Sequence, residues 1–381
     1  MEAQAIALVL RMFREVIDPR QANARHRLID ILTIAMMAIL SDCDDYEAIV
    51  DFGRDNRALF KQVLALPHGI PSVSTFRRVF ARLDPEELGR CLKQWTQELA
   101  KCHKGKQIAI DGKTLCGSID RAWNKLGVHM VTAYCVQDEL VLAQVATDQK
   151  SNEITAVPKL LEMVDLEGAV VTGDAMNCQK RIIQDIVRRK GDYVIAVKEN
   201  HPTLYGQVRR LLNEARLEKF ASVQHDKFTE VNGGHGRVET RRVYCSSELV
   251  QWVSQRADWA GLKSIVLVER QRRTAEKDSL EQHYFLSSLA GNDAKRVGRV
   301  IRNHWAIENG QHWCLDMGFR EDECQVCKDN GPQNLAAIRR IALNLLKRDK
   351  SVKLGISNKR KKAARNRDYM FKLLTQSSNT K

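Results

Sequence analysis

The sequence lacks the features of secreted and membrane proteins. It has no internal repeat, and no signal peptide precedes its first helical pattern. The most apolar window, residues 28–40, is too short to cross a bilayer and contains Asp30. The cysteines form no short secreted-type framework; they lie at positions 43, 91, 102, 116, 135, 178, 245, 314, 324 and 327. These absences predict a cytoplasmic protein with reduced thiols and no membrane segment.

The composition is that of a globular protein with a surplus of positive charge. The 381 residues, 44% hydrophobic and 28% charged, suffice for two or three domains. A formal net charge of +14 points toward a polyanionic partner, most often nucleic acid. From Arg339 to Lys381 fourteen Lys and Arg stand against two Asp, a net of +12, which leaves about +2 for the rest of the chain. We predict that residues 349–381 form a basic tail, disordered when free, that binds DNA phosphates through Lys359, Arg360, Lys361 and Lys362.

The first hundred residues have helical apolar spacing throughout, and we assign 1–100 to a helical N-terminal domain with a role in DNA binding. Within it, residues 71–80 read as a turn, a serine cap and a short helix that carries Arg77 and Arg78. As a DNA-binding helix it would offer both arginines to phosphates or to guanine edges. The alternative is an ordinary capped helix with a solvated basic face.

The pattern changes after residue 100. Three strand-like runs come first, and then helix, strand, helix and strand alternate, which is the element order of a ribonuclease-H-like core and implies parallel pairing of the later strands. A mainly β insertion at about 205–290 interrupts this α/β domain, which we place at 101–348. The runs are strands at 107–111, 128–136, 140–146, 168–173 and 192–198, helices at 154–164 and 178–190, insertion strands at 240–244, 264–269 and 283–288, and helices from 294 and at 335–348.

Three acidic residues stand out in this order. Asp111 ends the first strand and Asp174 follows the fourth, and these two strands are neighbours in such a core, so the carboxylates meet at the carboxyl edge of the sheet. Downstream, helical spacing over 302–312 puts Trp305, Glu308 and His312 on one face. An amphipathic helix with Glu308 in solvent is the plain alternative. Three carboxylates from separate segments favour Mg²⁺ or Mn²⁺, which prefer oxygen ligands.

Other residues compete for roles. Asp316 or Glu321 could replace Glu308 as the third acid. Lys113 and Lys198, near the strand ends, are either phosphate contacts or solvated rim lysines. A zinc site is a further alternative, and its ligands would be His312, Cys314, Cys324 and Cys327.

Five motifs in order resemble the insertion-sequence transposases that include the H-repeat-associated proteins, and residues 18–26 and 71–76 resemble that family's amino-terminal associated domain. The resemblance covers nearly the whole chain. The motifs are Asp111-Gly112-Lys113-Thr114, residues 173–179, residues 192–198, His304-Trp305-Ala306-Ile307-Glu308-Asn309 and residues 315–322.

The resemblance implies a DDE transposase with Asp111, Asp174 and Glu308 as its catalytic and metal-binding triad. It also implies two Mg²⁺ ions, with Mn²⁺ able to substitute, that support cleavage and transfer of double-stranded DNA at the terminal inverted repeats of the element. The acting form would be a homo-oligomer on two DNA ends. Lys113, Lys198, His304, Trp305, Arg77, Arg78 and the four tail residues 359–362 are the candidate DNA contacts.

The sequence departs from the broader superfamily's Tyr, Arg, Glu, Lys signature, because those places around Glu308 hold Ile301, His304 and Leu315. Cys116 and Cys327 stand where the closer family has basic residues nearby. Two alternatives therefore stay open. One is a catalytically inactive DNA-binding remnant of a decayed element, and the other is a structure-specific nuclease that cuts without joining.

Overall fold

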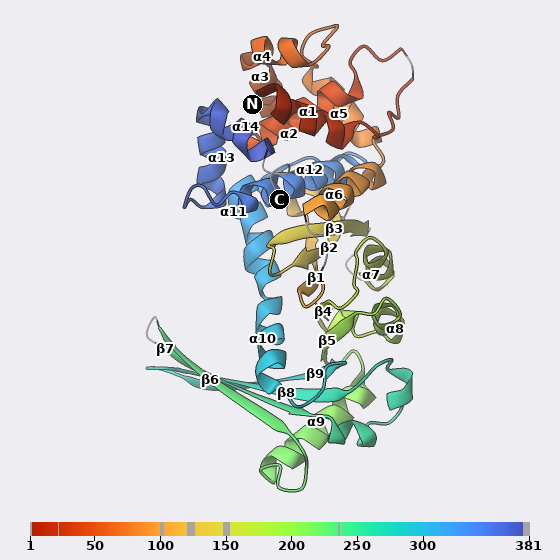
Figure 1. Ribbon diagram of the computed structural model, residues 1–381, viewed down its shortest axis with the longest axis vertical. Coiled ribbons are helices and arrows are strands. Elements are labelled where there is room, and N and C mark those ends of the chain that lie inside the picture. Colours follow the sequence, from red (N-terminus) through yellow and green to blue (C-terminus); the bar gives the residue numbers. More distant parts are fainter. Residues whose placement is uncertain are drawn as a thin grey trace.

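One nine-stranded sheet runs through the middle and one end of the molecule, and helices form the other end (Figure 1). The computed structural model describes residues 2–21, 23–99, 103–119, 126–147, 153–234 and 237–375. The strand order is β3-β2-β1-β4-β5-β9-β8-β7-β6.

The pairing of β1 with β4 and the parallel direction of the later strands are as predicted from the sequence. β1 pairs antiparallel with β2, which pairs antiparallel with β3, whereas β1, β4 and β5 run parallel. Parallel neighbours need crossover connections, and α7 and α8 supply them. The bounds are β1 Gln107–Thr114, β2 His129–Cys135, β3 Leu140–Thr147, α7 Glu153–Glu162, β4 Val170–Gly173, α8 Lys180–Arg188 and β5 Asp192–Val197.

The insertion extends the central sheet. Its last strand pairs antiparallel with β5, so the sheet continues without a break into a long four-stranded arm. Most arm strands are longer than predicted, and one was missed, because residues 226–234 are polar and largely exposed and form a strand only by pairing with β7. The elements are α9 Pro202–Leu217, β6 Asp226–Gly234, β7 Arg237–Ser246, β8 Ser264–Thr274 and β9 Asp278–Ser287.

Helices cover the two faces of the sheet differently. α7, α8 and α9 pack on one face, around Ile108, Val171 and Ile195. α10, Ala294–His304, packs on the other face against Val170 and the inner ends of the arm strands. The two faces thus have separate cores.

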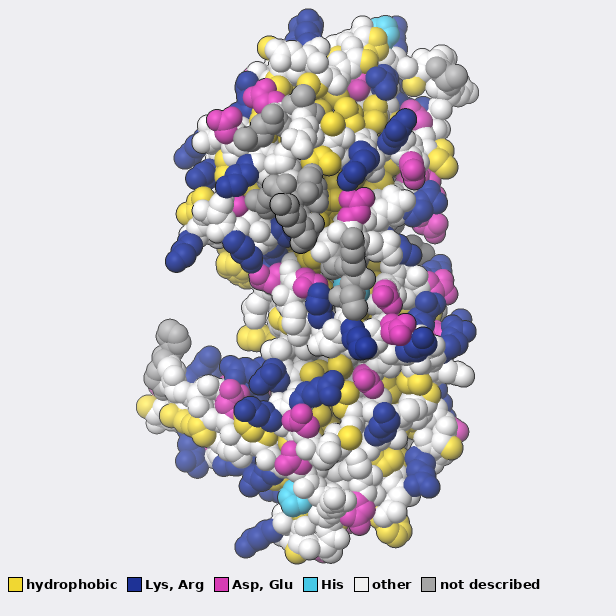
Figure 2. Space-filling view, viewed as in Figure 1, with side chains coloured by type: hydrophobic (Ala, Val, Ile, Leu, Met, Phe, Trp, Pro, Cys, Tyr) yellow, Lys and Arg dark blue, Asp and Glu magenta, His cyan; other side chains and the backbone are white. Residues whose placement is uncertain are grey.

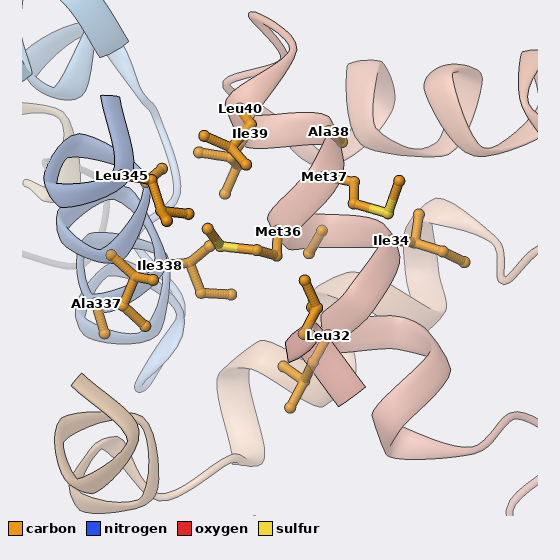
Figure 3. Close-up of a cluster of buried hydrophobic side chains, with 14 of the residues drawn as sticks. Leu32, Ile34, Met36, Met37, Ala38, Ile39, Leu40, Ala337, Ile338 and Leu345 are labelled. Carbon is orange, nitrogen blue, oxygen red and sulfur yellow. The ribbon is translucent and has the colours of Figure 1, made fainter. Parts of the chain in front are cut away.

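The helical end of the molecule combines both ends of the chain in one core. α2 is almost entirely buried and packs against α12, as the side chains of Leu32, Met36, Ile338 and Leu345 show (Figure 3). The helices are α1 Glu2–Phe13, α2 Leu28–Leu40, α3 Tyr46–Asp55, α4 Arg57–Val63, α5 Val73–Arg82, α6 Pro85–Leu99, α11 Trp313–Phe319, α12 Gly331–Arg348, α13 Ile356–Arg365 and α14 Arg367–Thr375.

The prediction of a disordered basic tail is wrong for residues 356–375, because they form α13 and α14 and pack into this core; residues 376–381 lie outside the described part. Arg360 is fully buried and bonds to the Ile39 carbonyl at 2.7 Å and to Asp44 Oδ1 at 2.7 Å. Lys359 is also buried and donates to the Leu346 carbonyl at 2.8 Å. Part of the positive charge at this end of the chain is therefore taken up by internal contacts.

Among the described residues, none of the helices has the length and apolar character needed to span a membrane.

Candidate active site

Asp111 and Asp174 lie side by side at the carboxyl edge of the parallel strands, as predicted. Ile110 of β1 pairs with Gly173 of β4, and each aspartate is the next residue in its chain segment. Thr172 bonds to His304 on α10 at 3.0 Å, so alternation along the strand turns Asp174 toward the α10 face. Asp174 also caps the short turn that comes after it, accepting from the Met176 amide at 3.0 Å. Backbone bonds thus fix the position of this carboxylate.

The negative charges of these carboxylates repel one another. Burial, with the charges of Asp174, Glu153 and Glu308, raises the pKa of Asp111 to about 7. Burial and the charge of Glu153 also raise the pKa of Asp174, against the lowering effect of Lys198. Such a cluster holds excess negative charge that a divalent cation would neutralise.

Glu308 stands at a break in a long helix. The predicted helix over 302–312 is divided, because the chain passes from α10 into a π-helical turn, Glu308–His312, and then into α11. Such turns often occur at functional sites. The Trp305 indole donates to Glu308 Oε2 at 2.6 Å, and His312 Nδ1 lies 3.7 Å from Asp111 Oδ2. On this predicted face His312 therefore lies near Asp111, and the charge of Glu308 contributes to the raised pKa of Asp111.

Two predicted DNA contacts have other roles. Lys113 is buried and forms ion pairs with Asp316 at 2.7 Å and Asp322 at 2.6 Å, so its charge is already balanced within the protein. Burial lowers the pKa of His304 to about 4, which leaves its ring neutral at physiological pH. A neutral His304 bonded to Thr172 joins α10 to β4, and it cannot replace the charge of an arginine at that place.

The alternative acids and the zinc site also find structural partners. Asp316 pairs with Lys113, and Glu321 forms a fully buried pair with Arg340 at 2.9 Å. Neither is free to act as the third acid. His312, Cys314, Cys324 and Cys327 do not come together as metal ligands among the described residues.

A different group of metal-ligand types, His103, Cys135 and Asp138, does come together within the described residues. Lys106 Nζ lies 2.8 Å from Asp138 Oδ2 and supplies a positive charge there. We therefore do not regard this cluster as a metal site.

The remaining predicted contacts are exposed to different degrees. Lys198 is exposed at the end of β5, close enough to Asp174 to lower its pKa, and it forms no ion pair with the described residues. Arg77 and Arg78 are exposed on α5, at the helical end of the molecule (Figure 1), where Arg77 pairs with Glu47 at 3.2 Å. On α13, Lys361 is exposed and Lys362 lies over the Tyr369 ring at 5.0 Å. DNA contact by these residues stays a prediction.

Sequence patterns did not predict a basic groove beside the carboxylates, which we name the arginine groove. It encloses about 500 Å³ between α10 and the arm strands. Figure 2 shows the surface hollowed between the arm and the helical end, with Lys and Arg side chains gathered along the arm. No local motif indicates the groove, since its residues alternate along strands far apart in sequence. They are Arg237, Glu239, Arg241, Val268, Arg270, Arg272, His283, Phe285, Ile301, Arg302 and Trp305.

The groove and the acids share the α10 side of the sheet. Trp305 belongs to both, because it lines the groove and donates to Glu308. Within the groove Glu239 pairs with Arg241 at 2.8 Å and Arg270 at 3.0 Å, whereas the exposed Arg237 and Arg272 form no ion pair within the part of the chain described. A net positive surface therefore leads to the third acid.

A further acid was also missed. Glu153, the first residue of α7, is buried and bonds to His129 Nε2 at 2.6 Å, and its charge contributes to the raised pKa of both aspartates. Nothing in its local sequence distinguishes it from an ordinary acid at a helix start.

Comparisons with known proteins cover almost the full chain. The family model described as Transposase DDE domain matches residues 103–345, and the model described as DDE_Tnp_1-associated matches residues 10–96. The chain is 35% identical over 369 residues to the H repeat-associated putative transposase YhhI of Escherichia coli (strain K12), covering 94% of this chain and 96% of that protein. It is 36% identical over 363 residues to the putative transposase YncI of Escherichia coli O157:H7, covering 94% and 92%.

Among solved structures, the piggyBac transposase in a synaptic complex with hairpin DNA has a TM-score of 0.42 and 14% identity, covering 98% of this chain and 80% of that chain. A likeness at this level is too weak to support an argument about fold or activity.

Proposed function

The chain belongs to the DDE transposase family, and we propose that it binds the terminal inverted repeats of its own element and catalyses Mg²⁺-dependent DNA strand cleavage and transfer. The single observation that carries the proposal is the register of β1 against β4, which pairs Ile110 with Gly173 and so sets Asp111 beside Asp174. Burial and the facing charges of Asp174, Glu153 and Glu308 raise the pKa of Asp111. Acids held together at this cost are expected where cations bind. The strand order β3-β2-β1-β4-β5 further supports a ribonuclease-H-like core.

The proposal takes two cations, as the resemblance to DDE transposases implies. Among described residues, the oxygens of Asp111, Asp174 and Glu308 do not all lie within 4.8 Å of one another, which is wider than ligands of a single Mg²⁺ ion would be. In two-metal sites the ions are about 3.5–4 Å apart, so Asp111, Asp174 and Glu308 would share two ions between them.

In this proposal some residues of the chain would bind the cations, and others would position the acids. Asp111, Asp174 and Glu308 would hold the cations, which when bound would activate the attacking hydroxyl and neutralise charge on the leaving oxygen. Trp305 holds Glu308 through the 2.6 Å bond from its indole. His312, 3.7 Å from Asp111 and kept neutral by burial, which lowers its pKa to about 4, adds no positive charge that would compete with a cation.

The DNA would run from the arm toward the acids. Arg237 and Arg272 form no ion pair among the described residues and line the arginine groove, and Lys198 lies near Asp174. These cations would bind backbone phosphates, which positions DNA without reading its sequence. Recognition of the repeats is then left to another surface, for which α5 with Arg77 and Arg78 stays the candidate. A homo-oligomer on two ends remains part of the proposal.

The test is cleavage of labelled DNA that carries the repeats flanking the gene, in Mg²⁺, by the wild type and by Asp174→Asn at equal DNA occupancy. We expect cutting at the repeat boundary and joining to target DNA by the wild type only. Cutting without joining would favour a nuclease. Binding without cutting by either protein would mean an inactive remnant.

The groove has its own test. Arg237→Gln with Arg272→Gln should lower the slope of log K against log salt by about 1.8, or about 0.9 for each lost phosphate contact. Arg210→Gln is the matched control, because Arg210 is exposed on α9 at the opposite face of the sheet. An unchanged salt slope in the double variant would show that DNA does not bind in the groove.

A further inference from the structure

Glu153 is the acid of this site that belongs neither to the triad nor to the motifs that resemble the family. It begins α7, on the face of the sheet opposite α10, and α7 contacts the turn that Asp174 caps. Its side chain is 4% exposed, which is rare for a glutamate. Its carboxylate therefore reaches the carboxyl edge of the sheet from the face opposite α10.

A chain of hydrogen bonds fixes the Glu153 carboxylate. His129 Nε2 lies 2.6 Å from Glu153 Oε1, and His129 Nδ1 lies 2.9 Å from Thr114 Oγ1. Thr114 and His129 are paired across β1 and β2. These hydrogen bonds thus connect the Glu153 carboxylate to β1 at Thr114, three residues after Asp111.

Gly112 lets this carboxylate come close. A Cβ added at Gly112 would stand 2.5 Å from Glu153 Oε1 and would also collide with His129 Nε2. The carboxylate and imidazole therefore occupy the space where a side chain would follow Asp111. Any larger residue at this position would push Glu153 away from the edge.

This arrangement is costly for a metal-free protein. The Glu153 carboxylate lies against Gly112, the residue after Asp111, and α7 contacts the turn that Asp174 caps, so its negative charge adds to that of the two aspartates. A buried polar pair kept only for stability gains little over apolar packing. A carboxylate that in addition brings negative charge to two repelling carboxylates is better explained by cations at that edge.

We propose that Glu153 is a fourth acidic group of the catalytic centre, held by His129, that strengthens divalent-cation binding at Asp111 and Asp174. The inference rests on the proposed function only in requiring that cations bind there. Glu153 acts as a positioning residue, through the charge it adds behind the two aspartates.

The experiment is calorimetric titration of Mn²⁺ into the full-length, metal-free protein without DNA, with the melting temperature in EDTA measured in parallel. Glu153→Gln removes the charge at constant size, and we expect Mn²⁺ binding at least tenfold weaker, the lower end of the effect of outer ligand-supporting groups. The melting temperature in EDTA should not fall, because repulsion is relieved. Glu162→Gln, exposed at the other end of α7, is the matched control and should bind Mn²⁺ as the wild type does.

A second variant covers the case in which Glu153→Gln fails to fold. Glu153→Leu with His129→Leu replaces the buried pair by apolar groups, and it too should lose tenfold or more in Mn²⁺ affinity. Affinity within twofold of the wild type in a folded variant would overturn the inference, provided that Asp174→Asn weakens Mn²⁺ binding. If Asp174→Asn also binds Mn²⁺ normally, the cation site of the proposed function fails, and this inference fails with it.

Discussion

Arg360 offers a direct choice between a structural and a DNA-binding role for the basic C-terminal residues. Its guanidinium is fully buried, lies over the Phe319 ring at 4.2 Å and joins α13 to the ends of α2 and α11. It donates to the carbonyls of Ile39 and Gly318 and pairs with Asp44. All three acceptors lie far from residue 360 in sequence.

Arg360→Met keeps an apolar stem of similar length and removes every donor. Breaking a buried pair costs about 3–5 kcal/mol. Among the residues that the structure describes, the Asp44 side chain would keep one ion pair, with the half-exposed Arg320 at 2.6 Å. At about 2–4 °C for each kcal/mol in a large domain, the melting temperature should fall by roughly 6–20 °C. DNA affinity below the melting temperature should not change.

The assay is thermal unfolding followed by circular dichroism, with DNA affinity measured at a temperature where both proteins are folded. Lys361→Met is the matched control, because Lys361 is the next residue and is exposed; its melting temperature should stay within about 1 °C, as for most surface substitutions. A folded Arg360→Met protein with an unchanged melting temperature and weakened DNA binding would refute the structural role and restore the DNA-binding one.

Two further predictions concern the acids. Since the pKa of Asp111 is raised to about 7, Mg²⁺ must displace a proton from it at lower pH. The apparent affinity for Mg²⁺ should therefore fall about tenfold per pH unit below 7 and level off above 8. In EDTA the free energy of unfolding should decrease as the pH rises from about 4 to 7, because an acid with a raised pKa in the folded state favours folding only while it is protonated. Asp111→Asn should reduce both dependences in calorimetry and thermal unfolding, leaving the part due to Asp174, and a profile unchanged by that substitution would contradict the assignment to Asp111. Trp305→Phe keeps a ring in the arginine groove but removes the donor to Glu308, so kcat for cleavage should fall about 10–100-fold with DNA affinity unchanged; an equal loss in DNA affinity would show that the indole acts on DNA instead.

The local pattern of apolar residues was sufficient to predict the central strands and helices. The apolar run 107–111 ends at Asp111, and the apolar run 168–173 is followed directly by Asp174. The alternation of strands and helices after residue 150 predicts parallel pairing, so the closeness of Asp111 and Asp174 could be predicted from the sequence. Local pattern failed where strands gain stability by pairing. Residues 226–234 have no apolar face, and only β7 makes them a strand.

The sequence by itself determined the order of strands and helices along the chain and the position of the acids at the ends of strands. Both depend on the period of apolar residues and on which residue ends a strand. What only the tertiary structure decided is which charges are free to act. Lys113 is neutralised by Asp322, 209 residues away, and Arg360 by Asp44, 316 residues away, whereas Arg237 and Arg272 become part of a groove because β7 and β8 pair in one register. The physical reason is that the energy of a charge depends on burial and on neighbours in space, and neither is written in the residues beside it.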